Sequence, residues 1–83
     1  MDLQNQIRTF IAERFLFDAA APIDPAQSLM KAGILDSTGA MELVMFLEDS
    51  LGVKVEDHEI TPANLDSVNS LVMFVQHKRT VNA

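Results

Sequence analysis

Two serines in this chain follow the same Leu-Asp pair, Ser37 at the end of residues 35–37 and Ser67 at the end of residues 65–67. A serine hydroxyl can act as a nucleophile, or it can cap the first turn of a helix. The sequence contains no cysteine, so disulfides, thiolate metal sites and a cysteine nucleophile are excluded. Any thioester chemistry would therefore need a thiol that the chain itself does not supply.

The two histidines and the acidic run at residues 56–59 are weaker candidates for chemistry. The run "EDHE" offers carboxylate and imidazole ligands, but it lacks the spaced oxygen ligands and the turn glycine of a calcium-binding loop. His58 and His77 have no accompanying nucleophile or oxyanion pattern. We therefore expect no metal site, no catalytic residue and surface positions for both histidines. The chain is not expected to be an enzyme.

The charge of the chain points to protein partners. It has 12 Asp and Glu residues against 6 Lys and Arg residues, which gives a formal net charge of -6. Between Asp36 and Asp66, Lys54 is the only lysine or arginine. An acidic surface repels nucleic acids and anionic membranes, and it attracts basic protein surfaces. We expect neither a nucleic-acid nor a membrane partner.

The length of the chain predicts one domain over residues 1–83, with a single small core. The core is expected over about residues 3–78, with residues 1–2 and 79–83 frayed. No apolar run is long enough to span a bilayer, and the N-terminus lacks the basic flank and apolar stretch of a signal peptide. A cytoplasmic protein is the resulting expectation.

Helical spacing of apolar residues predicts an all-α fold, a small four-helix bundle with three longer helices and a short third one. The first helix is expected from about Leu3 to Phe17. A long loop should follow, since the chain then brings two prolines and polar residues. Leu29 and Met30 are candidates to anchor this loop, and Gly33 permits a turn with positive φ.

After the second helix, the segment from Val53 alternates briefly, and we expect an extended loop with Val53 and Val55 turned inward. Thr61 before a proline predicts the start of the short helix. A last helix is expected after Asp66, with apolar residues at helical spacing and an end near residues 78–79, where two cations suit the helix dipole.

The second helix is the clearest element, and it should run from Ser37 to about Leu51 and stop at Gly52. One face carries the residues assigned to the core: Ala40, Leu43, Val44, Leu47 and Leu51. The opposite face and its flanks mix carboxylates with apolar side chains: Thr38, Met41, Glu42, Met45, Phe46, Glu48 and Asp49.

This mixture at the surface predicts a docking face for partner proteins. Two alternatives stay open. The long first loop could cover Met41, Met45 and Phe46. The carboxylates of Glu42, Glu48 and Asp49 could form only a solvated surface.

The run "GILDSTGAMELVMFLEDSLGVKV" resembles the signature of the acyl carrier protein and peptidyl carrier protein family. That signature has a glycine, an Asp-Ser pair, and a helix with Glu-Leu-Val and Leu-Glu before a Phe/Leu-Gly stop. The following run, "VEDHEITPANLDSVNSLVMFV", is similar to the family's acidic loop, short third helix and last helix. The resemblance covers about residues 28–75.

The resemblance implies that Ser37, with the adjacent motif residue Asp36, carries a covalent 4′-phosphopantetheine arm taken from coenzyme A, while Ser67 is an ordinary helix cap. The arm supplies the missing thiol and holds an acyl or aminoacyl group as a thioester. The implied partners are a phosphopantetheinyl transferase, an activating ligase and downstream acyl-processing enzymes with basic docking surfaces. The family also implies a monomer. The implied partner-binding residues are Thr38, Met41, Glu42, Met45, Glu48 and Asp49.

Thr38 and Gly39 depart from carriers of fatty-acid synthesis, which often have leucine and then an acidic residue there. A glycine inside a helix costs about 1 kcal/mol relative to alanine. The passages "LMKAGILDS" and "EITPANLDS" are more similar to free-standing carriers that serve an AMP-forming ligase. A specialised pathway is therefore favoured. The alternatives are a housekeeping fatty-acid carrier and an acidic interaction module in which Ser37 is only a cap.

Overall fold

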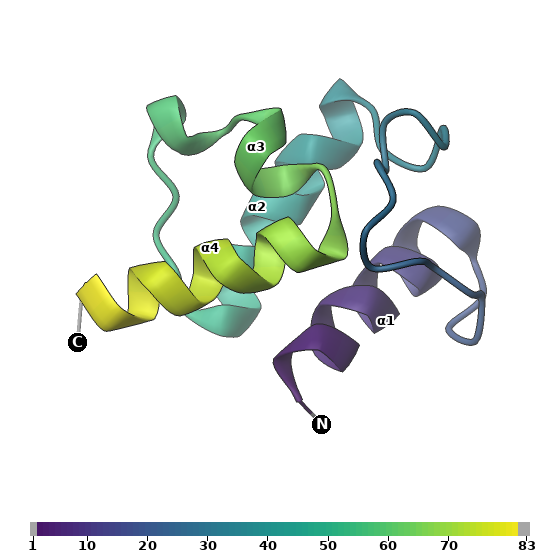
Figure 1. The fold of residues 1–83 in the computed structure, drawn as a ribbon, viewed down its shortest axis with the longest axis horizontal. Helices are drawn as coiled ribbons and strands as arrows, with labels where there is room; N and C mark the ends of the chain where they lie inside the picture. The colour runs from purple at the N-terminus through teal and green to yellow at the C-terminus, as the bar shows by residue number, and fades with distance from the viewer. Residues whose placement is uncertain (1, 82–83) are drawn as a thin grey trace.

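The computed structural model describes residues 2–81, and within them the chain forms four α-helices, one 3-10 helix and no strand (Figure 1). The predicted all-α four-helix fold is confirmed. In chain order the elements are α1 (Leu3–Leu16), α2 (Ser37–Leu51), η1 (Asp57–Glu59), α3 (Pro62–Leu65) and α4 (Val68–Val81).

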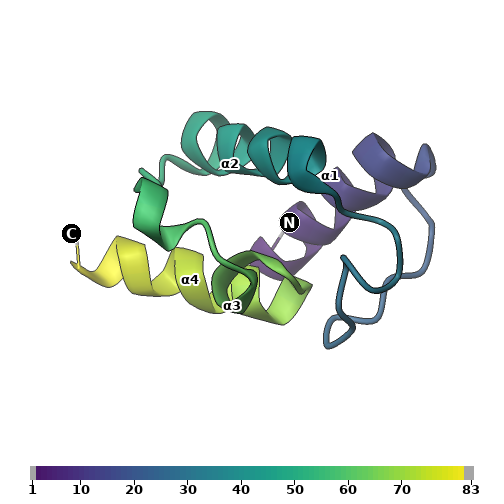
Figure 2. The same ribbon diagram turned by 90° about the horizontal axis from the view of Figure 1, so that it is seen from above.

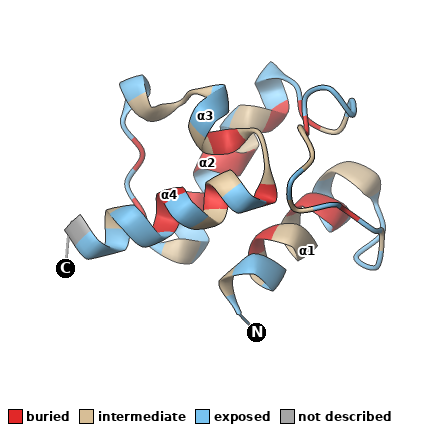
Figure 3. Ribbon diagram, in the orientation of Figure 1, coloured by how far each residue is buried: buried red, intermediate tan, exposed pale blue. Residues whose placement is uncertain are grey.

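The helices surround one core. α4 packs against both α1 and α3, and Figure 2 shows α2 and α4 on opposite sides of the molecule, with the long loop at one end. In Figure 3 the buried positions lie on the faces that the helices turn toward one another. Every longer helix contributes fully buried side chains, and the loop contributes one more: Ile7, Ile11, Leu29, Leu43, Leu47, Val68, Leu71 and Val75.

α1 begins and ends with clear caps. The Asp2 side chain accepts a hydrogen bond from the Asn5 amide, and Phe17 takes a left-handed conformation with φ 57°. The helix therefore ends at Leu16, one residue before the predicted end, because a residue in that conformation cannot continue a right-handed helix. Phe17 itself is 88% exposed.

The long loop is held down at its middle. Leu29 is fully buried, as expected, but Met30 is 51% exposed and does not anchor the loop through burial. Instead, the Met30 amide donates to Asp66 Oδ1 at 2.9 Å, and the Ser28 hydroxyl donates to Asp66 Oδ2 at 2.5 Å. Gly33 has the expected positive φ, 76°. One carboxylate next to α4 thus fastens the loop that leads to α2.

α2 has the predicted bounds. The Asp36 side chain caps its start, and Gly52 ends it with φ 68°. Two residues of the expected core face, Ala40 and Leu51, are half-buried rather than buried. Gly39, which the sequence marks only as a cost to the helix, is buried.

Glycine at position 39 permits close packing against Phe15 of α1 and against Leu35, which precedes α2. A Cβ atom at Gly39 would lie 3.1 Å from Phe15 Cε1 and 3.2 Å from Leu35 Cδ1. Such contacts are closer than ordinary van der Waals contact between carbon atoms. The missing side chain therefore lets the end of α1 approach the start of α2.

The segment after α2 follows the prediction, with one addition. Val53 and Val55 are buried, and Thr61 precedes the short helix that starts at Pro62. The turn η1 was not predicted; there the Glu56 and Glu59 side chains and backbone amides form a reciprocal capping box. Such a box stabilises a single turn without any apolar periodicity.

α4 ends at Val81, later than the predicted end near residues 78–79. Arg79 lies within the helix, and its guanidinium donates to the Leu51 carbonyl at 3.2 Å. The sequence predicts frayed ends at residues 1–2 and 79–83. In the structure Asp2 caps α1 and residues 79–81 belong to α4, while Met1 and residues 82–83 lie outside the described residues. The single-domain division stays a prediction.

An ion pair joins η1 to α4 and should make stability depend on pH. Lys78 Nζ lies 2.8 Å from Glu59 Oε1, with only 13% and 19% of the two side chains exposed. The hydrogen bond from Lys78, together with one from the Glu56 amide, lowers the pKa of Glu59 below its ordinary value of 4.5. A lowered folded-state pKa contributes stability above the unfolded-state pKa, and this stability is lost as the pH falls through the folded-state pKa.

We expect Lys78→Gln to lower the free energy of unfolding near neutral pH, and the difference from the unmodified chain to shrink as the pH falls below 4.5. Urea denaturation at a series of pH values measures both effects. Lys54→Gln is the control, since the Lys54 side chain is 81% exposed and its Nζ lies 3.8 Å from Glu56 Oε1. A constant difference between Lys78→Gln and the unmodified chain at all pH values would contradict this prediction.

Candidate functional site

The two Leu-Asp-Ser triplets have different structures. In the first, Asp36 Oδ1 accepts a hydrogen bond of 2.7 Å from the Gly39 amide, so the aspartate is the cap and Ser37 is the first residue of α2. In the second, Ser67 Oγ accepts a hydrogen bond of 3.0 Å from the Ser70 amide, so the serine is the cap. Ser37 is exposed, whereas Ser67 is half-buried. Capping therefore occupies the second serine and leaves the first accessible.

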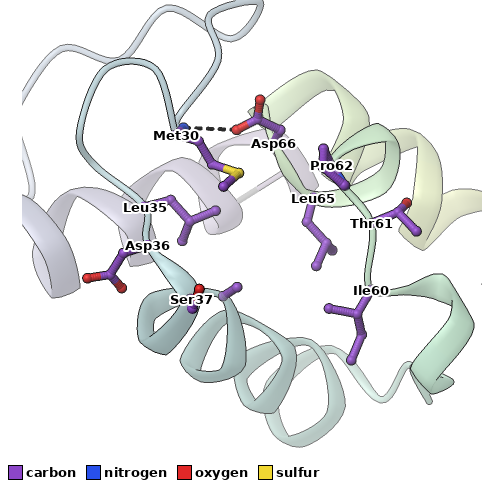
Figure 4. Close-up of a pocket in the computed structure, with 10 residues that line it drawn as sticks. Met30, Leu35, Asp36, Ser37, Ile60, Thr61, Pro62, Leu65 and Asp66 are labelled. Carbon is purple, nitrogen blue, oxygen red and sulfur yellow. Dashed lines mark hydrogen bonds between the residues drawn. The ribbon is translucent and has the colours of Figure 1, made fainter.

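A pocket of about 150 Å³ lies beside Ser37, between the start of α2, the long loop and α3 (Figure 4). Figure 4 shows Leu35, Ile60 and Leu65 pointing toward this space, while the Asp36 carboxylate points away from it. The pocket wall is mainly apolar. Ser37 thus lies at the border between solvent and a small apolar hollow.

The start of α2 suits a negatively charged group. The first amides of a helix have no partner within the helix, and the helix dipole places partial positive charge there. Gly39 N–H is already taken by Asp36, which leaves the amides of Ser37 and Thr38 to meet an anion. A phosphate ester on the Ser37 hydroxyl would therefore fit this position.

The expected partner residues occupy one side of α2, but the structure divides them. Thr38 and Asp49 are exposed, and the methionines Met41 and Met45 are 52% and 58% exposed. The loop therefore does not cover the two methionines. Phe46 is half-buried, because it stacks on Phe10 of α1 at a centroid distance of 4.1 Å rather than under the loop.

Two of the expected carboxylates have partners within the chain. Glu42 forms an ion pair with Arg14 of α1, and Glu48 Oε2 accepts a hydrogen bond of 3.1 Å from the Val55 amide. Sequence reasoning missed Arg14 at this face, since its own helix gives no sign of which residue it meets.

The other candidates lie away from this site. His58 and His77 are exposed, as expected. In residues 2–81 no group of three or more His, Asp or Glu side chains could hold a metal ion. None of the helices in that range is long and apolar enough to cross a membrane.

A small helical domain with an exposed serine at the start of its second helix, beside an apolar pocket, is an arrangement that suits a carrier domain for a covalently attached arm. Comparison with known proteins supports this class. The family described as "Phosphopantetheine attachment site" matches residues 5–75. The chain therefore belongs to the phosphopantetheine-binding carrier family.

Named relatives agree with this family. The chain is 34% identical over 74 residues to a probable acyl carrier protein, PigG, of Serratia sp. (strain ATCC 39006), covering 89% of this chain and 85% of the relative. It is 30% identical over 79 residues to the D-alanyl carrier protein of Streptococcus sanguinis (strain SK36), covering 95% and 98%.

A solved structure shows the same fold. One chain in a crystal structure described as that of an FAD-dependent dehydrogenase superposes with a TM-score of 0.72 at 32% identity, covering 82% of this chain and 96% of that chain. The prosthetic group of the family is covalently attached 4′-phosphopantetheine, which supplies the thiol that this cysteine-free chain lacks. Carrier proteins of this family are not catalytic themselves.

Proposed function

We propose that Ser37 is the attachment point of the 4′-phosphopantetheine arm, and that the chain presents thioester-bound acyl or aminoacyl groups to partner enzymes. The observation that carries this assignment is the contrast between the two triplets. Asp36 caps α2 and leaves Ser37 exposed, whereas Ser67 is used as a cap for α4. The match over residues 5–75 supports a modified serine within that range.

Attachment of the arm requires a nucleophilic hydroxyl on a helix whose first turn has a fixed conformation. The Ser37 oxygen attacks the phosphorus next to the pantetheine of coenzyme A, a new P–O bond forms, and the bond to the adenosine 3′,5′-bisphosphate leaving group breaks. The serine proton goes to a base of the phosphopantetheinyl transferase. Asp36 fixes the first turn through the Gly39 amide, and the free amides of Ser37 and Thr38 then favour the phosphodiester.

The cargo that fits best is a small acyl or aminoacyl group loaded by an AMP-forming ligase. Relatives named D-alanyl carrier proteins support an aminoacyl group, and the pocket beside Ser37 measures only about 150 Å³. Gly39 distinguishes the helix start from that of fatty-acid carriers, which favours a specialised pathway. A housekeeping fatty-acid carrier is the alternative.

A flavin enzyme is a candidate downstream partner. The match to the structure described as that of an FAD-dependent dehydrogenase covers 82% of this 83-residue chain and 96% of the matched chain. The matched chain is therefore no larger than a carrier domain. The occurrence of a chain of this size and fold in a structure described as that of an FAD-dependent dehydrogenase supports this candidate partner.

The exposed side of α2 is the proposed docking face for these enzymes. It comprises Thr38, Met41, Glu42, Met45, Glu48 and Asp49, and it lies on the helix that starts with the modified serine. Exposed methionines offer adaptable apolar contact, while the carboxylates steer basic surfaces and raise the association rate more than the affinity.

The experiment that tests the function is the intact mass of the protein after incubation with coenzyme A, Mg²⁺ and a broad-specificity phosphopantetheinyl transferase. One added phosphopantetheine, located on Ser37 by peptide fragmentation, is the expected result. No added mass on folded protein would favour an acidic interaction module without a prosthetic group.

A further inference from the structure

The exposed side of α2 meets α1 in a groove of about 420 Å³, which we call the α1–α2 groove. Its floor is aromatic, because Phe10 and Phe46 stack with ring planes 14° apart, and Met45 stands beside it with 58% of its surface exposed. Stacked rings held between two helices form a rigid apolar surface. The residues used in the following argument are Phe10, Arg14, Glu42, Met45, Phe46 and Asp49.

The chain places one of its own cations in this groove. The Arg14 guanidinium donates a hydrogen bond to Glu42 Oε1, with 55% and 33% of the two side chains exposed. A guanidinium therefore fits in the groove beside the aromatic rings. Arg14 thus shows that the groove can hold a cationic side chain. Because an exposed ion pair contributes only about 0–1 kcal/mol, another cation can displace Arg14 at little cost.

The charge balance of the groove favours a basic occupant. Glu42 and Asp49 line it together with a single cation, Arg14. While Arg14 occupies Glu42, one of the two carboxylates is neutralised. The net charge of the whole chain, -6, acts in the same direction at longer range.

We propose that the α1–α2 groove receives a lysine or arginine of the phosphopantetheinyl transferase, together with a neighbouring apolar side chain, and that Arg14 is an internal competitor displaced from Glu42. This proposal rests on the proposed carrier function. It extends the docking face from α2 onto α1 and makes Arg14 a residue that sets the strength of docking.

The test compares two variants that each remove one positive charge. Arg14→Gln frees Glu42, whereas Lys54→Gln removes a cation that is 81% exposed and is not among the groove residues. The kcat/KM for modification by the transferase with coenzyme A and Mg²⁺ is measured at low and at high salt. We expect Arg14→Gln to raise it roughly two- to fivefold at low salt, mainly through KM, since about 1 kcal/mol of competition is removed.

The control separates local from overall charge. Lys54→Gln should change kcat/KM by clearly less than Arg14→Gln, because its effect is only long-range steering. Fluorescence titration of the transferase with each variant, without coenzyme A, measures the Kd of the complex. Arg14→Gln should lower this Kd more than Lys54→Gln does. Met45→Gln should raise KM, since it removes the apolar part of the contact. Equal effects of Arg14→Gln and Lys54→Gln, or no effect of Arg14→Gln, would overturn the groove proposal.

A charge reversal distinguishes failure of the groove proposal from failure of the proposed docking face on α2. The double variant Glu42→Lys/Asp49→Lys should slow modification, most strongly at low salt. If it does, and Arg14→Gln behaves like Lys54→Gln, only the groove proposal is wrong. If the double variant is modified at an unchanged rate, the docking face on α2 is wrong as well. Addition of mass at Ser37 tests the carrier function independently of both.

Discussion

Replacement of Ser37 by alanine should abolish addition of phosphopantetheine, while replacement of Ser67 by alanine should leave it complete. The two serines share the same preceding residues, Leu and Asp, so local sequence cannot explain a difference between them. The structure can. The Ser67 hydroxyl is held by the Ser70 amide and Ser70 hydroxyl, at 3.0 and 2.9 Å, whereas Ser37 is exposed at the free start of α2.

The stability of the two variants should show the reverse order. Ser67→Ala removes a helix cap and should lower the free energy of unfolding by about 1 kcal/mol. Ser37→Ala should change it little, because Asp36 supplies the cap of α2. Intact mass and urea denaturation of both variants measure these effects. Normal modification of Ser37→Ala, or loss of modification in a folded Ser67→Ala, would contradict the assignment.

Local signals explain why the bounds of α2 could be predicted from the sequence. Its start depends on a capping side chain three residues before Gly39, and its end depends on a glycine that takes positive φ. Both signals lie within one turn of the helix end that they fix. The same holds for Thr61-Pro62 before α3. The exposed position of Ser37 follows from these local rules once Asp36 is recognised as the cap.

Contacts between distant segments could not be predicted in the same way. Periodicity assigns Phe46 to a flank of α2, but only the fold shows that Phe10 of α1 covers it. Likewise, Glu42 was expected on a free acidic face, and the packing of α1 beside α2 brings Arg14 to it. A single sequence records which face a residue occupies and leaves open which residue it meets.

The proposed docking face changes its character because of these contacts. Glu42 pairs with Arg14, and Glu48 accepts a hydrogen bond from the Val55 amide, so two carboxylates of the acidic stripe have partners within the chain that the sequence does not reveal. Asp49 is exposed, with the two methionines nearby on the same helix. We therefore expect apolar contact to contribute more to the proposed docking face, and simple charge steering less, than the sequence alone suggests.

The largest effect on stability is expected from Asp66→Ala, although Asp66 looks like a second copy of the cap Asp36. Its carboxylate accepts hydrogen bonds from the Ser28 hydroxyl and the Met30 amide, across 38 and 36 residues of sequence. Hydrogen bonds to a charged acceptor contribute about 1.5–3 kcal/mol each, and their loss leaves two donors of the loop without this partner. Loss of part of this total, about 2–3 kcal/mol, is expected.

That loss is a substantial fraction of the roughly 4–12 kcal/mol that stabilises a chain of this length. Asp36→Ala is the matched control, since it removes one cap, on the Gly39 amide, and should cost only about 1 kcal/mol. Hydrogen exchange provides the local measurement. The Met30 amide should exchange faster in Asp66→Ala than in the unmodified chain, and its exchange rate should be unchanged in Asp36→Ala. Equal losses of stability in the two variants would mean that Asp66 does not fasten the loop. A larger loss in Asp66→Ala would show that the second triplet holds in place the loop that leads to the first.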